Sequence, residues 1–261
     1  MTDAAPPSDT PTQKSAMSGA ANEAVEIVKT IVYALLIALV LRVILFQPFT
    51  IPSESMEPAL LKGDYIIVSK YSYGWSRHSI PFSPPIARGR LMNRVPERGD
   101  IIVFKLPRDG RTDYIKRLIG LPGDRIQVTG GVVSVNGKQI PRVDMGPTQD
   151  PGMPAMRVEQ FKETQPNGKT YITFDQSPDH EGDTTEVYIV PEGHYFFMGD
   201  NRDNSLDSRW PTETGVGFVP AENLVGKAQV ILLSWKDGAS LFKPWTWFTK
   251  AQPKRFFHRL K

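Results

Sequence analysis

The stretch TIVYALLIALVLRVILF, from Thr30 to Phe46, separates the chain into two parts of different character. Its only charged side chain is Arg42, and apolar residues continue to Phe49. A run that is this long and apolar on every face suits the hydrocarbon core of a bilayer once flanking residues are counted. Arg42 lies near the C-terminal end, where its long stem lets the guanidinium reach the interface. No small-residue cleavage site follows, so the sequence predicts an uncleaved transmembrane anchor over residues 27–46.

The alternative interpretation of this run is a buried helix in a soluble protein. It is disfavoured because the run follows a segment with very few large apolar residues. Residues 1–22 are rich in Pro, Ser, Thr, Ala and Asp. Such a segment cannot bury enough surface to offset its ordering entropy, so a disordered tail is predicted over residues 1–26. Charge leaves the orientation open, because only Lys29 closely precedes the run and Lys62 is the next basic residue after Arg42.

Beyond the anchor the sequence pattern is almost wholly that of β-strands. The chain has 23 Pro and 21 Gly, which fall between short runs rich in Val, Ile and Phe. This pattern predicts a β-rich body with many turns. Asn136-Gly137 after Ile126–Val135 indicates a hairpin, because these residues favour the positive φ of a two-residue loop. The other predicted strands are Asp64–Val68, Ile101–Leu106, Asp113–Ile119, Val187–Val190, His194–Met198 and Leu224–Ser234.

Two stretches stand apart from this pattern. Residues 76–98 are rich in Pro and Arg and predict a long surface loop, whereas residues 146–186 are polar and predict an insertion of ribbon and loops. The basic excess is largely in the tail from Leu241 to Lys261, where aromatic residues alternate with Lys and Arg. That tail predicts either an interfacial segment that rests on anionic headgroups or an unstructured basic tail.

The composition excludes several classes of function. A net charge of +3 gives no general affinity for nucleic acid. The absence of Cys excludes a cysteine nucleophile, a thiolate zinc site and any disulfide. The four His residues are scattered without a metal-binding spacing, so no metal is predicted.

Three short islands carry unusual chemistry. The first is the Pro-rich segment 47–58, in which Ser53 and Ser55 lie two residues apart. The second places Lys116 inside an apolar strand pattern, and the third is the almost entirely polar run 199–209. Each has an ordinary interpretation as a turn serine, a solvent-facing lysine or a capped surface turn. Their combination favours a catalytic one.

These islands resemble the conserved boxes of bacterial type I signal peptidases. Ser55-Met56-x-Pro58 is similar to the nucleophile box, and Tyr114-Ile115-Lys116-Arg117 is similar to the general-base box. GDNRDNSLDSR, residues 199–209, matches the third box at every position expected to be fixed. The boxes occur in the family's order after one anchor, and the resemblance runs from about residue 30 to 235.

The resemblance implies a serine endopeptidase in which Ser55 attacks the scissile carbonyl and Lys116 acts as general base. The amine must be neutral for this role, and burial of a lysine lowers its pKa. A Ser–Lys pair is a known variant of the catalytic triad and needs no cofactor. The resemblance places Ser53 and the backbone N–H of Ser55 at the oxyanion. The resemblance also implies that Ser205 orients the lysine amine and that Asp207 pairs with Arg209 beneath the site.

The resemblance also implies the substrate and the location. Preprotein signal peptides would bind as an extended strand and be cut after a small-x-small motif, with Phe49, Ile51 and Ile115 lining the pockets. The alternative role for these three side chains is core packing, and both roles can hold. The anchor would lie in the bacterial inner membrane with a cytoplasmic N-terminus and a periplasmic body, and the enzyme would act as a monomer.

The predicted fold is mainly β, with one transmembrane helix before a catalytic domain of coiled antiparallel sheets. The catalytic domain comprises residues 47–125 and 187–235, an inserted β-ribbon subdomain comprises 126–186, and a basic aromatic tail comprises 236–261. Two alternative functions stay open. One is a specialised peptidase for a single envelope substrate, and the other is a non-catalytic, membrane-tethered β module that binds extended peptides. Self-cleaving repressors, lipases and penicillin-binding enzymes are disfavoured because their accompanying motifs are absent.

Overall fold

The protein is described by a computed structural model that covers residues 13–80, 83–84, 89–177, 179–236, 238–239 and 243–260. The chain separates into two units, Met1–Arg42 and Val43–Lys261, and each is described by itself. Four predictions fall partly outside the described residues. They are the disordered tail at positions 1–12, the surface loop at 81–82 and 85–88, the inserted subdomain at 178, and the C-terminal tail at 237, 240–242 and 261.

The first unit is formed by helix α1, Gln13–Ile44. Its segment Asn22–Ile44 is long and apolar enough to cross a membrane. The predicted anchor is therefore helical, but two boundaries differ. Residues 13–26 are helical where a disordered tail was predicted, because this Ala-rich stretch only has to extend an existing helix rather than nucleate a new one. At the other end, Phe46 already belongs to a strand.

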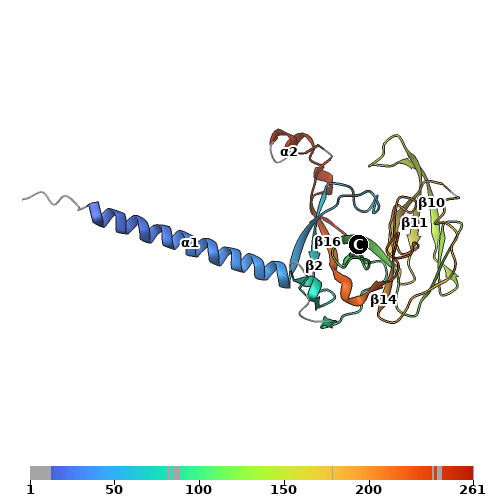
Figure 1. The fold of residues 1–261 in the computed structure, drawn as a ribbon. Coiled ribbons are helices and arrows are strands. Elements are labelled where there is room, and N and C mark those ends of the chain that lie inside the picture. Colours follow the sequence, from blue (N-terminus) through green and yellow to red (C-terminus); the bar gives the residue numbers. More distant parts are fainter. Residues whose placement is uncertain are drawn as a thin grey trace, which may run out of the picture. The chain divides into compact units, whose positions relative to one another are not determined.

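The second unit is built around an antiparallel eight-stranded sheet, ordered β1-β2-β16-β5-β6-β14-β15 with β17 also paired to β16 (Figure 1). This arrangement confirms the mainly β fold with a coiled antiparallel sheet. Apart from the run Ile126–Val135, the predicted strands are present within one or two residues of their predicted ends. The bounds of this sheet are β1 Phe46–Thr50, β2 Asp64–Ser69, β5 Ile101–Lys105, β6 Asp113–Gly120, β14 His194–Met198, β15 Val219–Pro220, β16 Leu224–Ser234 and β17 His258–Arg259.

Strand β6 has two neighbours with different extents. Its residues 113–117 pair with β5, in the register Lys105↔Asp113 to Ile101↔Arg117. On its other side, the pairing with β14 begins only at Arg117, which lies opposite Met198. The segment 113–116 therefore has a strand on one side and no partner from β14 on the other.

The inserted segment forms two smaller sheets. The four-stranded sheet β13-β7-β8-β9 consists of Tyr188–Ile189, Arg125–Thr129, Val132–Val135 and Lys138–Gln139. The three-stranded sheet β10-β11-β12 consists of Arg142–Gln149, Arg157–Thr164 and Thr170–Asp175. The predicted hairpin at Asn136-Gly137 is confirmed, and both residues have positive φ. A second hairpin, at Gly130-Gly131, lies within the run that was predicted as its first arm.

The inserted segment shares its hydrophobic core with the main sheet. One buried cluster joins Ile126 and Val133 of the insertion to Ile119 of β6 and Phe196 of β14. Because these side chains bury one another, the insertion packs directly onto the strands that carry the predicted general base and precede the third motif. The polar pattern of residues 146–186 gives no sign of this packing.

The C-terminal tail and the predicted surface loop are both structured where they are described. The tail contains α2 Trp245–Thr249 and η3 Pro253–Arg255, and Arg255 forms an ion pair with the buried Asp64. The loop region contains β3 Trp75–Ser76, η1 Arg77–Ser79 and β4 Arg90–Leu91. The short helix η2, Ala221–Asn223, immediately precedes β16. Arg90 donates hydrogen bonds to the carbonyls of Tyr73, Gly74, Ala221 and Leu224. These contacts fix both segments on the main sheet.

Candidate active site

Ser55 and Lys116 come from segments far apart in sequence. Ser55 lies in the turns between β1 and β2 and is 9% exposed. Lys116 lies on β6 opposite Ile102 of β5 and is 3% exposed. The Lys116 Nζ donates a hydrogen bond of 2.5 Å to the Ser55 Oγ. The structure therefore brings together the two residues that the sequence singled out as nucleophile and base.

The setting of Lys116 favours its neutral form. Burial lowers the pKa of the amine to about 8, and the Arg209 guanidinium contributes in the same direction. The charges of Asp207 and Asp200 oppose this shift. Desolvation has the larger effect on the pKa, because the charged ammonium loses its water and gains no direct carboxylate partner among the described contacts. An amine with this pKa carries a useful neutral fraction near pH 7 to 8.

Ser53 lies beside Ser55 in the same turn region. The two hydroxyl oxygens of Ser53 and Ser55 are 3.4 Å apart. The backbone N–H of Ser55 donates no hydrogen bond among the described residues. A hydroxyl and a free N–H are thus both available next to the Ser55 Oγ.

The third motif approaches the nucleophile through its glycine. A Cβ on Gly199 would lie 2.3 Å from the Ser205 Oγ and 2.5 Å from the Ser55 carbonyl oxygen, so no larger residue fits. Two residues further on, the Asn201 N–H donates to that same Ser55 carbonyl at 3.2 Å. The sequence motif gave no reason to assign Asn201 this contact. Together the two positions fix the nucleophile's backbone against the loop.

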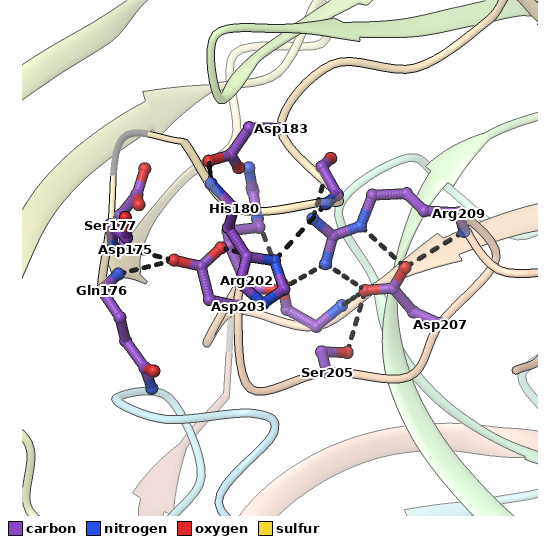
Figure 2. A network of polar contacts seen from close by, with 12 residues as sticks. Asp175, Gln176, Ser177, His180, Asp183, Arg202, Asp203, Ser205, Asp207 and Arg209 are labelled. Atoms are coloured by element: carbon purple, nitrogen blue, oxygen red, sulfur yellow. Dashed lines mark hydrogen bonds and ion pairs between the residues drawn. The ribbon is translucent and has the colours of Figure 1, made fainter.

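The rest of the motif folds around Asp207 (Figure 2). The Arg209 Nε donates to Asp207 Oδ1 and its Nη2 donates to Oδ2, each at 2.9 Å. The Ser205 hydroxyl donates to Asp207 Oδ2 at 2.9 Å, and the Gly199 N–H donates to the same oxygen at 3.0 Å. The Asp207–Arg209 pair is thus formed. Ser205 bonds to Asp207, and a hydrogen bond from Ser205 to Lys116 is not among the described contacts.

A second buried ion pair lies next to the predicted base, and the sequence interpretation gave it no role. Arg117 donates to Asp200 through Nε and Nη2, both at 2.7 Å, and the guanidinium stacks 4.1 Å above the Tyr171 ring. Arg117 belongs to the general-base motif and Asp200 to the third motif, so the sequence does contain both members of the pair. The pairing connects β6 to the third motif immediately beside Lys116.

A cleft of about 1080 Å³ opens over these residues. Of the three predicted pocket residues, Ile115 lines it. Ile51 is buried in an apolar cluster, and Phe49 and Ile115 both pack against that cluster. Further lining side chains that the sequence interpretation did not assign are Tyr114, His180, Glu181, Leu206, Trp210 and Thr214. A serine hydroxyl and a buried amine are thus in contact at the wall of a cleft.

Comparisons with known proteins give the family. Residues 24–235 match the family described as Signal peptidase, peptidase S26. A signal peptidase I of Rickettsia typhi is 46% identical over 212 residues, which cover 78% of each chain. One from Rickettsia canadensis is 44% identical over 217 residues, covering 80% of this chain and 79% of the relative. A solved signal peptidase I from Enterococcus faecalis V583 is 27% identical with a TM-score of 0.30, covering 51% of this chain and 97% of that one.

The chain belongs to the signal peptidase family, peptidase S26. It is therefore a serine peptidase that cleaves signal peptides, and its apolar helix α1 fits a single membrane span.

Proposed function

We propose that this protein cleaves signal peptides from secreted preproteins with Ser55 as nucleophile and neutral Lys116 as general base. The observation that carries the proposal is the 2.5 Å hydrogen bond between a buried amine and a serine hydroxyl at the cleft. A lysine used only for binding or solubility gains nothing from such burial, because desolvation disfavours its charge.

In the first step the Ser55 Oγ attacks the carbonyl carbon of the scissile peptide bond, and its proton passes to the Lys116 Nζ. The resulting ammonium then gives a proton to the leaving amine, and an ester between Ser55 and the signal peptide remains. Water attacks that ester with Lys116 again accepting a proton, and the Ser55 hydroxyl is restored. One buried amine can serve every proton transfer because it alternates between its two protonation states.

The negative oxygen of the tetrahedral intermediate requires donors placed in advance. The Ser53 hydroxyl and the free Ser55 N–H are the donors we assign. Their position beside the Ser55 Oγ supports this role. Loss of one such donor typically lowers kcat by about 100- to 1,000-fold.

Ser205, Asp207 and Arg209 act as positioning residues. The Asp207 carboxylate accepts hydrogen bonds from the hydroxyl of Ser205, the guanidinium of Arg209 and the N–H of Gly199, which form one buried network. That network supports the loop whose Gly199 and Asn201 contact the nucleophile. We assign Ser205 the role of orienting the Lys116 amine from the same wall of the cleft, which both residues line.

The substrate binds as an extended strand alongside residues 113–116 of β6. This segment lacks a β14 partner and lies at the cleft, so its free backbone groups can pair with a peptide. Ile115 lines the cleft, and Phe49 and Ile51 pack in the same apolar cluster behind it. We assign this apolar wall the role of admitting small side chains and excluding large ones. This arrangement supports cleavage after a small-x-small motif.

We place the helix α1 in the bacterial inner membrane, with the N-terminus in the cytoplasm and the β unit on the outer side. A substrate anchored in the same bilayer then meets the site at a high effective concentration. All of the assigned chemistry comes from one chain, which supports action as a monomer. The exposed Trp245, Trp247, Phe248 and Phe257 of the C-terminal segment support its contact with the headgroup region.

The test is cleavage of a preprotein by detergent-solubilised enzyme, with wild type, Ser55→Ala and Lys116→Ala compared side by side. The wild type should cut after the small-x-small motif, and both variants should lose at least 1,000-fold in kcat, roughly the cost of removing a catalytic group. Full activity of Lys116→Ala would show that another group is the base. A wild type that cuts no general preprotein but cuts one envelope protein would indicate a specialised peptidase.

A further inference from the structure

Three aspartates meet outside the residues used in catalysis. Asp175 ends β12, Asp183 lies in the loop that follows, and Asp203 belongs to the third motif. One carboxylate oxygen from each can be chosen so that all three lie within 4.8 Å of one another. Figure 2 shows Asp203 facing the backbone of Gln176 and Ser177, with Asp183 near His180.

Each of these aspartates has one oxygen without a hydrogen-bond donor. The Oδ1 atoms of Asp175, Asp183 and Asp203 are buried and unpartnered among the described residues. Asp175 and Asp183 are 6% and 3% exposed, and the Asp203 side chain is 0% exposed. Their Oδ2 atoms are satisfied by other groups. A buried carboxylate oxygen without a partner is costly, so three in one place indicate a missing positive group.

The neighbouring cations do not fill this need. Arg142 forms an ion pair with Asp175 through Oδ2 alone. Arg209 is bound to Asp207 by both carboxylate oxygens. The His180 Nδ1 lies 3.5 Å from Asp203 Oδ1 and makes no hydrogen bond to it, and the same nitrogen accepts a hydrogen bond from the Gly182 N–H. Three carboxylates therefore face one directly paired guanidinium, Arg142.

The number of oxygens favours a metal ion over a shared proton. A proton can join two carboxylates, but it leaves the third oxygen unpartnered. Ca²⁺ binds oxygens at about 2.3–2.6 Å, so two ligands on opposite sides of it are at most roughly 5 Å apart. Three carboxylate oxygens within 4.8 Å of one another fit one such sphere, with water for the remaining positions. Ca²⁺ accepts a flexible geometry, whereas Mg²⁺ demands a near-ideal octahedron at about 2.1 Å, so three carboxylates from separate segments suit Ca²⁺ better.

We propose that Asp175, Asp183 and Asp203 form a site for one divalent cation, with Ca²⁺ preferred. Burial raises the pKa of Asp175 and Asp183, and the charge of Asp203 adds to the rise at Asp175. The sequence predicts no metal because its histidines lack a metal-binding spacing, and the three carboxylates do not form a contiguous motif.

The cation would join the inserted segment to the third motif. Asp175 and Asp183 come from the insertion, whereas Asp203 lies two residues from Asn201, which contacts the Ser55 carbonyl. Asp203 and His180 also line the cleft. Bound Ca²⁺ therefore fixes this wall of the cleft, and its removal loosens the wall without removing a catalytic group.

The test uses the full chain in detergent after treatment with a chelator. Isothermal titration with CaCl₂ should show about one ion bound per chain, and Asp183→Asn should weaken binding by at least tenfold, as loss of a charged ligand predicts. The matched control is Asp179→Asn, an exposed aspartate in the same loop, which should bind like wild type. Asp203→Asn provides a second ligand variant if Asp183→Asn does not fold.

Thermal unfolding gives an independent measurement. CaCl₂ at about 100 times the wild-type Kd should raise the Tm of wild type and Asp179→Asn by on the order of 5–10 °C, and should raise the Tm of Asp183→Asn by at most about half as much. The idea is overturned if CaCl₂ gives the wild type neither binding heat nor a Tm shift, or if Asp183→Asn responds like wild type. Neither readout depends on peptidase activity, so failure here is separate from failure of the proposed catalytic mechanism.

Discussion

Replacing Lys116 with methionine should stabilise the folded protein at neutral pH while it abolishes peptidase activity. The pKa of Lys116 is about 8 in the folded chain, against an ordinary value of 10.5. That difference corresponds to about 3 kcal/mol by which folding disfavours the charged amine. Methionine fills a similar volume and carries no charge. It loses the hydrogen bond to Ser55, worth about 1 kcal/mol, so a net gain of about 2 kcal/mol is expected at pH 7.

The pH dependence of this gain has a definite sign. Because the folded pKa of Lys116 is lowered, the folded protein releases this proton from about pH 8, whereas the unfolded chain holds it until about pH 10.5. The wild type therefore becomes more stable relative to the variant as the pH rises through that window. The advantage of Lys116→Met should shrink from about 2 kcal/mol at pH 7 to nearly zero by about pH 9.5.

The assay is urea unfolding of both proteins from pH 6 to 9.5, with the free energy of unfolding extrapolated linearly. Lys138→Met, at an exposed position on the β8–β9 hairpin, controls for the introduction of a methionine. A variant that is less stable than wild type by a constant amount at every pH would refute the reasoning, since the amine would then carry no desolvation cost.

Three further predictions concern the surroundings of the nucleophile. Gly199→Ala should lower kcat by about 100-fold or more, because its Cβ would lie 2.5 Å from the Ser55 carbonyl oxygen and must displace the nucleophile. Steady-state kinetics measures this effect, and an unchanged circular dichroism spectrum shows that the variant is folded. An unaltered kcat would contradict the prediction. Ser53→Ala should lower kcat by about 100- to 1,000-fold with little change in KM, whereas an effect confined to KM would argue for a binding role. Asp200→Asn should destabilise the fold by about 3–5 kcal/mol in urea unfolding, because it leaves the Arg117 guanidinium buried without its carboxylate, and a loss below 1 kcal/mol would show that the pair is dispensable.

Much of the fold follows from local patterns in the sequence. The strands His194–Met198 and Leu224–Ser234 have the predicted bounds, because each is a continuous apolar or alternating run that ends at turn residues. The hairpin at Asn136-Gly137 is equally local, since two residues with positive φ determine it. Patterns of this kind identify elements, but they do not tell which elements pair.

The parts that could not be predicted depend on distant residues. Strands β10 and β11 are largely polar, and they pair with each other and with β12 in one antiparallel sheet. The sequence of the C-terminal tail favours an interfacial segment and an unstructured basic tail equally. Its docking depends on the ion pair between Arg255 and Asp64, which are far apart in sequence.

In the candidate site, too, local motifs are predictable from the sequence and contacts between distant residues are not. The motifs located Ser55, Lys116 and Asp207, because these chemical types are unusual in their local settings. The partnership of Arg117 with Asp200 and the meeting of Asp175 with Asp183 and Asp203 were not predictable. Both arise from the packing of the insertion and the third motif against the main sheet.

The central claim is that a neutral Lys116 activates Ser55, and the pH profile of kcat/KM for a signal-peptide substrate tests it most directly. The profile of the free enzyme reports the ionisation of the essential base. Since burial lowers the pKa of Lys116 to about 8, the rate should rise tenfold per pH unit below that value and level off above it. A rate that is constant from pH 6 to 9, or a rise centred near pH 10.5, would contradict the claim.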